Sequence, residues 1–307
     1  MGLATTAAAR LPQSTQGWVS LLQRALDFPI ESVAFPPHFY LHTFTKGTDT
    51  ASRFSPQLTP LKLTTQQQSA VLLLLSPAET GASFQDMCIT LTKRTETLAS
   101  HKGEMSFPGG RVDADETPRD AAQREALEEA GLLPAEYDII GSLSPIATNV
   151  HGTRVTPFVA VANKPAQARC ASPDEVASIH YLHLSNLLLR SSTRHARLIK
   201  DRSSICKGPC LFPCFFASPA QTVACPAVCP SPKAARVEED CGFDPMLPED
   251  FPGELVWGIT AFIVCELVAR IAQVITGATE VNKTDAVNAL LTPSNVVARD
   301  PLAQLVK

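Results

Sequence analysis

Three glutamates, Glu125, Glu128 and Glu129, have the residue type and the spacing that best suit chemistry in this chain. In a helix, spacings of three and four residues place their carboxylates on one side. Like charges at these spacings destabilise a helix by roughly 0.2–0.5 kcal/mol per pair, so helix stability alone does not favour them. A divalent cation reverses this repulsion, and oxygen ligands suit Mg²⁺ or Mn²⁺, which also bridge to substrate phosphates. The alternative interpretation is a solvated acidic face balanced by Arg119 and Arg124.

The residues around the glutamates predict the helix that must carry them. Thr117 is a suitable N-cap, Pro118 suits the first helical position, and Asp120 completes a capping box. Gly131 is placed to end the helix in the left-handed conformation. We therefore expect a helix over residues 118–130. A stripe of small residues on this helix would let it pack closely on a sheet. The stripe consists of Ala122, Ala126 and Ala130.

Short apolar runs on both sides of the helix predict the strands of a mixed α/β domain. These runs are residues 70–75, 87–92, 139–143, 155–161 and 179–182. A Leu-rich segment follows at 184–189, and a further strand at 255–260 leads into a helix over about 261–275. The apolar run 255–265 is shorter than the about 18 residues that a membrane-spanning helix needs, so we expect no membrane span.

The composition argues against several classes of function. The chain has 307 residues, 45% of them hydrophobic, which suits a globular protein of one or two domains. Its 26 Lys and Arg against 30 Asp and Glu give a net charge of −4, so no basic field favours nucleic acid or an anionic membrane. No GxSxG, Walker A or GxGxxG arrangement occurs, which disfavours serine hydrolases, P-loop proteins and dinucleotide oxidoreductases.

The N-terminal segment allows two interpretations. Residues 1–26 lack acidic side chains and carry Arg10 and Arg24, a composition that resembles a mitochondrial transit peptide. Apolar residues also recur there at helical spacing, which predicts a helix that docks on the main domain. These residues are Trp18, Leu21, Leu22, Ala25 and Leu26. We favour the docked helix and expect an intracellular protein, mitochondrial or cytosolic.

The full spacing around the glutamates resembles the Nudix box. Gly110, Glu116, the pair Arg124 and Glu125, the pair Glu128 and Glu129, and Gly131 all stand at the positions of that motif. The one departure is Ala126, where a larger aliphatic residue is usual. The resemblance implies a Nudix α/β/α sandwich with a mixed sheet, and hydrolysis of a nucleoside diphosphate linked to another moiety.

The same resemblance implies the ligands of the metal. Glu125, Glu128 and Glu129 would hold Mg²⁺ or Mn²⁺, with a backbone carbonyl near Gly109 helping. Such ions neutralise the diphosphate and lower the pKa of a bound water, which a carboxylate then deprotonates.

Other roles follow from the motif in the same way. Arg124 would orient the carboxylates through a salt bridge, and Glu116 would support them from the preceding loop. We choose Glu125 first as the general base. Glu175, on a later loop, is a second candidate, although an ordinary surface turn residue is the interpretation we prefer for it.

The segment before the box is similar to the signature of the coenzyme A diphosphatase branch of Nudix hydrolases, LLTxR(S/A)xxxRxxxGxxxFPGG. Residues 91–110 follow it, except that Thr95 replaces Ser or Ala and Ala99 stands at an Arg position; Thr90 replaces the first Leu. The resemblance extends over about residues 68–200 and 253–275, and it implies cleavage of coenzyme A to 3′,5′-ADP and 4′-phosphopantetheine. Relatives of this branch are often peroxisomal. Another diphosphate derivative such as ADP-ribose or NADH is the alternative substrate, and a binding module without catalysis is disfavoured by the intact glutamates.

Coenzyme A carries a 3′-phosphate besides its diphosphate, so its pocket should offer more than one cation. Four cations lie near the motifs: Lys93, Arg94, Lys102 and Arg154. We choose Arg94 and Lys102 as substrate-binding residues. His101 contacts a phosphate or caps its own loop, and we favour the loop.

Three segments make up the expected organisation: an N-terminal extension at 1–67, a Nudix domain at 68–275 and a tail at 276–307. A stretch rich in Cys and Pro at 203–252 is expected to be a low-order insertion in the domain. Its cysteines have permissive zinc spacing, but we favour free thiols. They are Cys206, Cys210, Cys214, Cys225 and Cys229.

Overall fold

All five apolar runs before residue 185 form strands of one sheet. In the computed structural model, the chain is described for residues 11–28, 67–78, 86–147, 153–189, 195–199, 210–219, 253–276 and 295–297. The longer strands in these ranges are β1 (Gln68–Pro77), β2 (Met87–Arg94), β5 (Tyr137–Ser142), β7 (Arg154–Ala162), β8 (Val176–His183) and β10 (Cys210–Pro219). The shorter strands are β3 (Met105–Ser106), β4 (Gly109–Arg111), β6 (Ile146–Ala147), β9 (His195–Ile199), β11 (Glu254–Val256) and β12 (Asn295–Val297).

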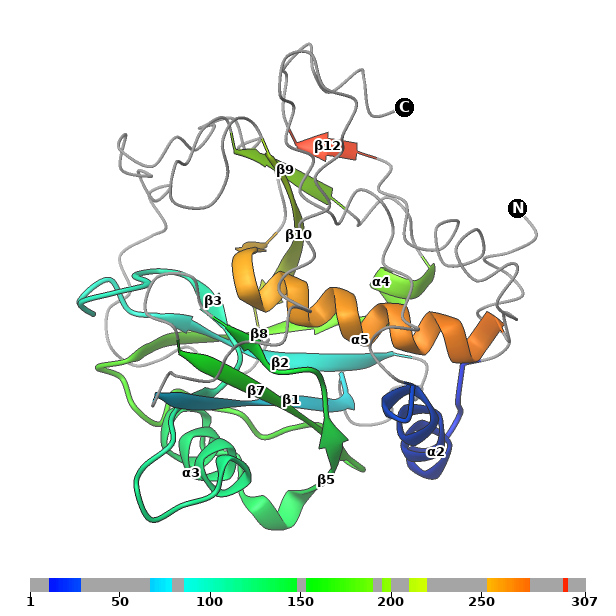
Figure 1. Cartoon of the computed structure of the whole chain (residues 1–307), viewed down its shortest axis with the longest axis horizontal. Coiled ribbons are helices and arrows are strands. Elements are labelled where there is room, and N and C mark those ends of the chain that lie inside the picture. Colours follow the sequence, from blue (N-terminus) through cyan, green and yellow to red (C-terminus); the bar gives the residue numbers. More distant parts are fainter. Residues whose placement is uncertain are drawn as a thin grey trace.

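Both strand directions occur in this sheet. Its main path through the described residues runs β12-β9-β10-β8-β2-β1-β7-β5 (Figure 1). β1 pairs with β7 in parallel, whereas the pairs β1 with β2, β2 with β8, and β5 with β7 are antiparallel. The predicted mixed sheet is therefore confirmed.

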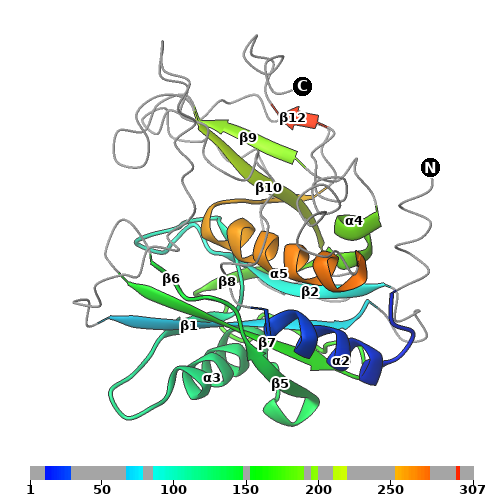
Figure 2. The ribbon, with the colours of Figure 1, turned by 45° about the vertical axis from the view of Figure 1, so that its right-hand side comes forward.

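Alternation along β1 explains the three layers of the fold. Leu73 and Leu75 face one core, shared with the helices α2 (Thr15–Leu26) and α5 (Gly258–Thr276). Leu72 and Leu74 face a second core under the helix α3 (Pro118–Ala130). Since successive side chains of a strand point to opposite faces, one apolar strand can serve both layers. Figure 2 shows α3 on one side of the sheet and α2 with α5 on the other, the expected α/β/α sandwich.

The helix predicted at 118–130 is confirmed together with its ends. The Thr117 hydroxyl accepts a hydrogen bond from the Asp120 amide, and the Asp120 carboxylate accepts one from the Thr117 amide. Gly131 follows the helix in the left-handed conformation, at φ 63°. Its alanines pack on the sheet with their side chains fully buried. These alanines are Ala121, Ala122, Ala126 and Ala130.

The N-terminal helix docks on the domain, as expected. Trp18 and Leu22 of α2 are fully buried in the core that α5 also covers, and Gly141 of β5 lies against Leu26. A helix from the N-terminal extension thus completes the core of the main domain. The boundary expected between this extension and the domain, at residue 67, therefore does not separate two cores.

The helix α5 is mostly apolar, and its two charged residues are Glu266 and Arg270. By length and composition, the stretch Gly258–Ile275 could cross a membrane, but 83% of it is buried inside the protein. It covers the sheet face opposite α3, which is the position of a core helix (Figure 1). A shorter helix, α4 (Leu184–Leu189), forms from the Leu-rich segment.

The expectation of a low-order insertion over 203–252 is wrong for part of that stretch. Residues Cys210–Pro219 form β10, which pairs with β8, β9 and β11. Phe215 and Ala217 of this strand are buried in the main core. Cys210 and Cys214 both lie in this strand, four residues apart. The other three cysteines of the cluster lie outside the described residues.

Candidate active site

Arg124 is the centre of the acidic cluster on α3. Its Nη2 and Nε donate to the two carboxylate oxygens of Glu116, at 2.7 and 3.1 Å. Its Nη1 donates to Glu125 Oε1 and to Glu128 Oε2, each at 3.0 Å. One guanidinium thus orients three carboxylates, two from the helix and one from the loop before it.

The pair between Arg124 and Glu116 stays charged at neutral pH. The hydrogen bonds from Arg124 lower the pKa of Glu116, and the backbone amide of Asp113 adds to this effect at 2.9 Å. The same contact with Glu116 raises the pKa of Arg124 above its ordinary value. Glu116 therefore serves as a permanent counter-charge for Arg124.

Glu129 is the most buried carboxylate of the cluster. Its side chain is 4% exposed, and its Oε2 accepts a hydrogen bond from the Gly109 amide at 3.1 Å. Burial raises the pKa of Glu129 to about 7, against the opposing effect of the Gly109 hydrogen bond. Burial also raises the pKa of Glu125, which Arg124 opposes. Burial thus penalises the ionised form of each carboxylate, and a divalent cation beside them would stabilise those ionised forms.

Two glycines let β4 pass close to its neighbours. A Cβ atom on Gly109 would overlap the carbonyl oxygen of Ala70 and the backbone of Val71. A Cβ atom on Gly110 would overlap the carboxylate of Glu125. The glycine pair therefore seats β4 between β1 and α3. The Gly109 amide contacts the cluster by donating to Glu129, whereas the role of a backbone carbonyl near Gly109 as a metal ligand stays a prediction.

Gly110→Ala is expected to lower kcat/KM for diphosphate hydrolysis by about 10- to 100-fold without unfolding the protein. The three heavy atoms nearest to the added methyl group belong to the Glu125 carboxylate, which must move, and displaced catalytic groups cost rates of this size. Kinetics and thermal unfolding of the purified variant test this expectation. Gly109→Ala is the matched comparison, because its methyl group meets backbone and should lower stability instead. Full activity in Gly110→Ala would show that the position of Glu125 does not matter.

The structure brings Arg94 to the cluster but not Lys102. Arg94 ends β2, is half-buried, and lies close enough to lower the pKa of Glu129. Its Nε is buried and has no hydrogen-bond partner within the described part of the chain. Lys102 is exposed on the following loop, and no ion pair between described residues joins it to the cluster.

The other residues considered from the sequence have different surroundings. His101 Nδ1 lies 2.8 Å from Glu104 Oε2 in its own exposed loop, in line with the loop role favoured for it. Lys93 pairs with Glu254 of β11 at 2.7 Å. Glu175 is exposed, yet it lies near enough to raise the pKa values of Glu125 and Glu129.

Comparison with known proteins identifies the class. Residues 66–201 match the NUDIX domain model. An uncharacterized Nudix hydrolase NudL of Cronobacter sakazakii is 37% identical over 141 residues, which cover 45% of this chain and 69% of that protein. The chloroplastic Nudix hydrolase 22 of Arabidopsis thaliana is 35% identical over 118 residues, or 38% of this chain and 37% of that protein.

Solved structures of Nudix proteins are also similar. The Nudix hydrolase RenU of M. Smegmatis aligns with 39% of this chain and 71% of its own, at 24% identity and a TM-score of 0.32. A C. elegans Ap4A hydrolase aligns with 40% of this chain and 83% of its own, at 18% identity and a TM-score of 0.33.

This chain belongs to the Nudix hydrolase family. It is thus a hydrolase of the class that acts on pyrophosphate bonds, and Nudix hydrolases generally use divalent metals. The residues present fit such a metal, because the cluster supplies only carboxylate oxygens and two of these carboxylates have pKa values raised by burial.

Proposed function

We propose that this Nudix hydrolase cleaves the diphosphate bond of coenzyme A and its thioesters, using Mg²⁺ or Mn²⁺, and releases 3′,5′-ADP and 4′-phosphopantetheine or its acyl form. The observation that carries the proposal is Arg94. It occupies the first Arg position of the coenzyme A signature. Its Nε is buried near Glu129 and has no hydrogen-bond partner among the described residues. A buried, unsatisfied guanidinium nitrogen next to a metal cluster is suited to receive a phosphate oxygen of the substrate.

The glutamates of α3 would hold the metal ions. Glu129 would present its carboxylate from the buried side, where the Gly109 amide orients it, and Glu128 from the exposed side. The bound ions would neutralise the diphosphate and lower the pKa of the attacking water.

Glu125 would accept the proton of that water. Its Oε1 is held by Arg124, so Oε2 is the oxygen left for the proton. The water oxygen forms the new bond to phosphorus, the anhydride P–O bond breaks, and the leaving phosphate takes the electron pair. Arg124 keeps Glu125 and Glu128 in place during this step, and Glu116 keeps Arg124 in place.

Paired substrates test the assignment. Wild-type protein should hydrolyse coenzyme A with a kcat/KM at least about tenfold above that of 3′-dephospho-coenzyme A, because the ligand that lacks the phosphate leaves pocket cations unpaired. Arg94→Gln and Lys102→Gln should shrink this preference and act less on the dephospho substrate. Arg119→Gln, an exposed change in the first turn of α3, is the control and should leave the preference unchanged.

The same assay distinguishes the alternatives. Equal kcat/KM for the two coenzyme A substrates, with faster hydrolysis of ADP-ribose or NADH, would reject coenzyme A and keep the Nudix activity. Binding of these compounds without any turnover in Mg²⁺ or Mn²⁺ would instead indicate a binding module.

A further inference from the structure

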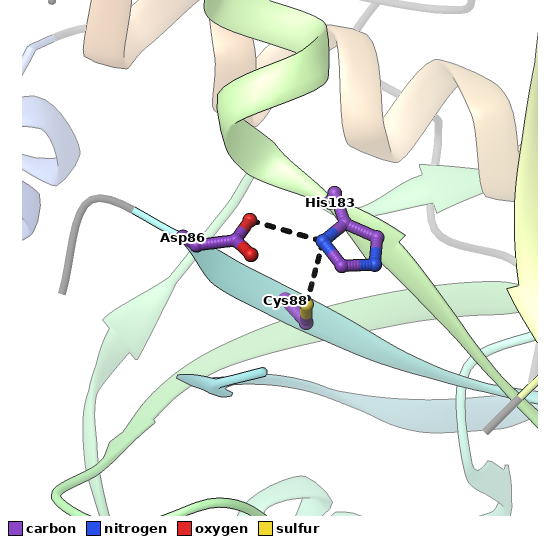
Figure 3. A group of neighbouring side chains, drawn as sticks. All are labelled: Asp86, Cys88 and His183. Atoms are coloured by element: carbon purple, nitrogen blue, oxygen red, sulfur yellow. Dashed lines mark hydrogen bonds and ion pairs between the residues drawn. The ribbon is translucent and has the colours of Figure 1, made fainter. Parts of the chain in front are cut away.

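Three side chains with metal-binding atoms meet at the beginning of β2. Asp86 precedes the strand, Cys88 lies within it, and His183 ends β8, where the register pairs it with Cys88 (Figure 3). His183 Nδ1 lies 3.4 Å from Cys88 Sγ and 3.0 Å from Asp86 Oδ1. All three ligand atoms lie within 4.8 Å of one another, which holds for no other trio of His, Cys, Asp or Glu among the described residues.

This trio is separate from the acidic cluster. Cys88 and Arg94 stand six residues apart in β2, so about 20 Å of extended strand separates them. The trio therefore takes no part in the proposed hydrolysis, and a ligand bound there is a second ligand.

The contacts do not have the pattern of a nucleophilic Cys–His–Asp relay. In such a relay the thiol and the carboxylate bond to different ring nitrogens of the histidine. Here both approach Nδ1, and one nitrogen cannot donate a proton to Asp86 and also accept one from Cys88. The thiol and the carboxylate lie against the same ring nitrogen instead.

The two distances from His183 Nδ1 are compatible with a tetrahedral zinc ion. Zinc bonds of about 2.3 Å to sulfur and about 2.0–2.2 Å to nitrogen and oxygen place ligand atoms roughly 3.3–3.6 Å apart. The observed 3.4 and 3.0 Å are within a few tenths of this range. A thiolate and an imidazole also select zinc over Mg²⁺ or Mn²⁺, which prefer oxygen ligands.

The trio is buried on the side of Cys88 and partly exposed to solvent on the side of His183 and Asp86. Cys88 is fully buried, whereas the side chains of His183 and Asp86 are 29% and 42% exposed. Water can therefore reach a fourth position.

We propose that Asp86, Cys88 and His183 form a zinc site that is open to solvent at its fourth position and ties the start of β2 to the end of β8. The site joins adjacent strands at the sheet end away from Arg94, so its occupancy should raise the stability of the sheet.

Cobalt and zinc titration of the chelator-treated full-length chain tests the site. Co²⁺ should bind with a thiolate-to-cobalt charge-transfer band, and Zn²⁺ should displace it. Cys88→Ser should remove the band. Asp86→Asn removes a direct ligand, so it should weaken Zn²⁺ binding by more than the about 10- to 100-fold that the loss of an outer-shell partner costs. Cys170→Ser, a half-buried change elsewhere, is the matched control and should keep the band.

The cysteine-rich stretch needs its own control, because it also offers thiols. A variant with Cys206, Cys210, Cys225 and Cys229 changed to Ser should keep the band. Zn²⁺ should also raise the thermal unfolding temperature of the wild type but not of Asp86→Asn, a change that a partly exposed side chain accommodates without unfolding the protein. The proposal is overturned if no band forms, if the band survives in Cys88→Ser, if it is lost in the four-cysteine variant, or if Zn²⁺ stabilises Asp86→Asn as much as the wild type.

Discussion

Glu129→Gln is expected to lower kcat by at least about 100-fold while the protein stays folded. The amide oxygen of Gln can still accept the hydrogen bond from the Gly109 amide, and the volume of the side chain is kept. The change removes the buried negative charge that would hold the metal, and losing one such electrostatic contact to the reacting groups costs about 10²–10³ in rate. Turnover at saturating substrate over a range of Mg²⁺ and Mn²⁺ concentrations measures the loss.

Asp138→Asn is the matched control for this experiment. Asp138 is an exposed carboxylate on β5, so its neutralisation should leave kcat unchanged. Urea unfolding of metal-free Glu129→Gln should show a stability no lower than that of the wild type, because the variant no longer buries a charge. Turnover near the wild-type value would mean that the metal site has been misplaced.

Arg270→Met is expected to lower the free energy of unfolding by about 3–5 kcal/mol, the usual cost of leaving a buried charge without its partner. Arg270 Nε donates to Glu266 Oε1 at 2.9 Å, and both side chains are 5% exposed. Its Nη1 donates to the carbonyl oxygens of Ala25 and Phe28, at 3.1 and 2.6 Å, which ties α5 to the end of α2. Urea unfolding gives the change in free energy.

Two further variants identify the cause of that loss. Glu266→Gln combined with Arg270→Met should be more stable than Arg270→Met alone, because no unpaired carboxylate remains. In the double variant the Ser144 hydroxyl can still donate to the amide oxygen of the introduced glutamine, as it does to the Glu266 carboxylate at 2.9 Å. Arg24→Met, an exposed change on α2, should cost less than about 1 kcal/mol. A loss below about 1 kcal/mol in Arg270→Met would contradict the assigned role of the ion pair.

Local rules made the helix α3 predictable from the sequence. The capping box at Thr117 and Asp120 and the left-handed Gly131 act within a few residues, so they define both ends of α3 without tertiary information. Side-chain periodicity then places the three glutamates on one side and the alanines on the sheet. The strands follow from the same kind of argument, since continuous apolar runs such as that of β1 serve a sheet buried on both faces.

Composition was a poor guide where tertiary packing opposed it. Prolines and cysteines in residues 203–252 suggested irregular structure, yet Cys210–Pro219 joins the sheet as β10. The aromatic residues Phe215 and Phe216 were the available signal, because aromatic side chains favour strands. The sheet supplied neighbours for this strand: β9, which is near in sequence, and β8 and β11, which are farther away.

The sequence by itself therefore determined the family, the helix α3 and the acidic cluster, because these depend on contacts between residues close along the chain. Tertiary structure decided which distant side chains meet. It set Arg94 beside Glu129, bound Arg270 to carbonyl groups of the N-terminal segment, and placed His183 against Cys88, 95 residues earlier. The physical reason is strand register and helix docking: a shift of one residue in the pairing of β2 with β8 would turn His183 to the opposite face of the sheet, and nothing local to either strand specifies that register.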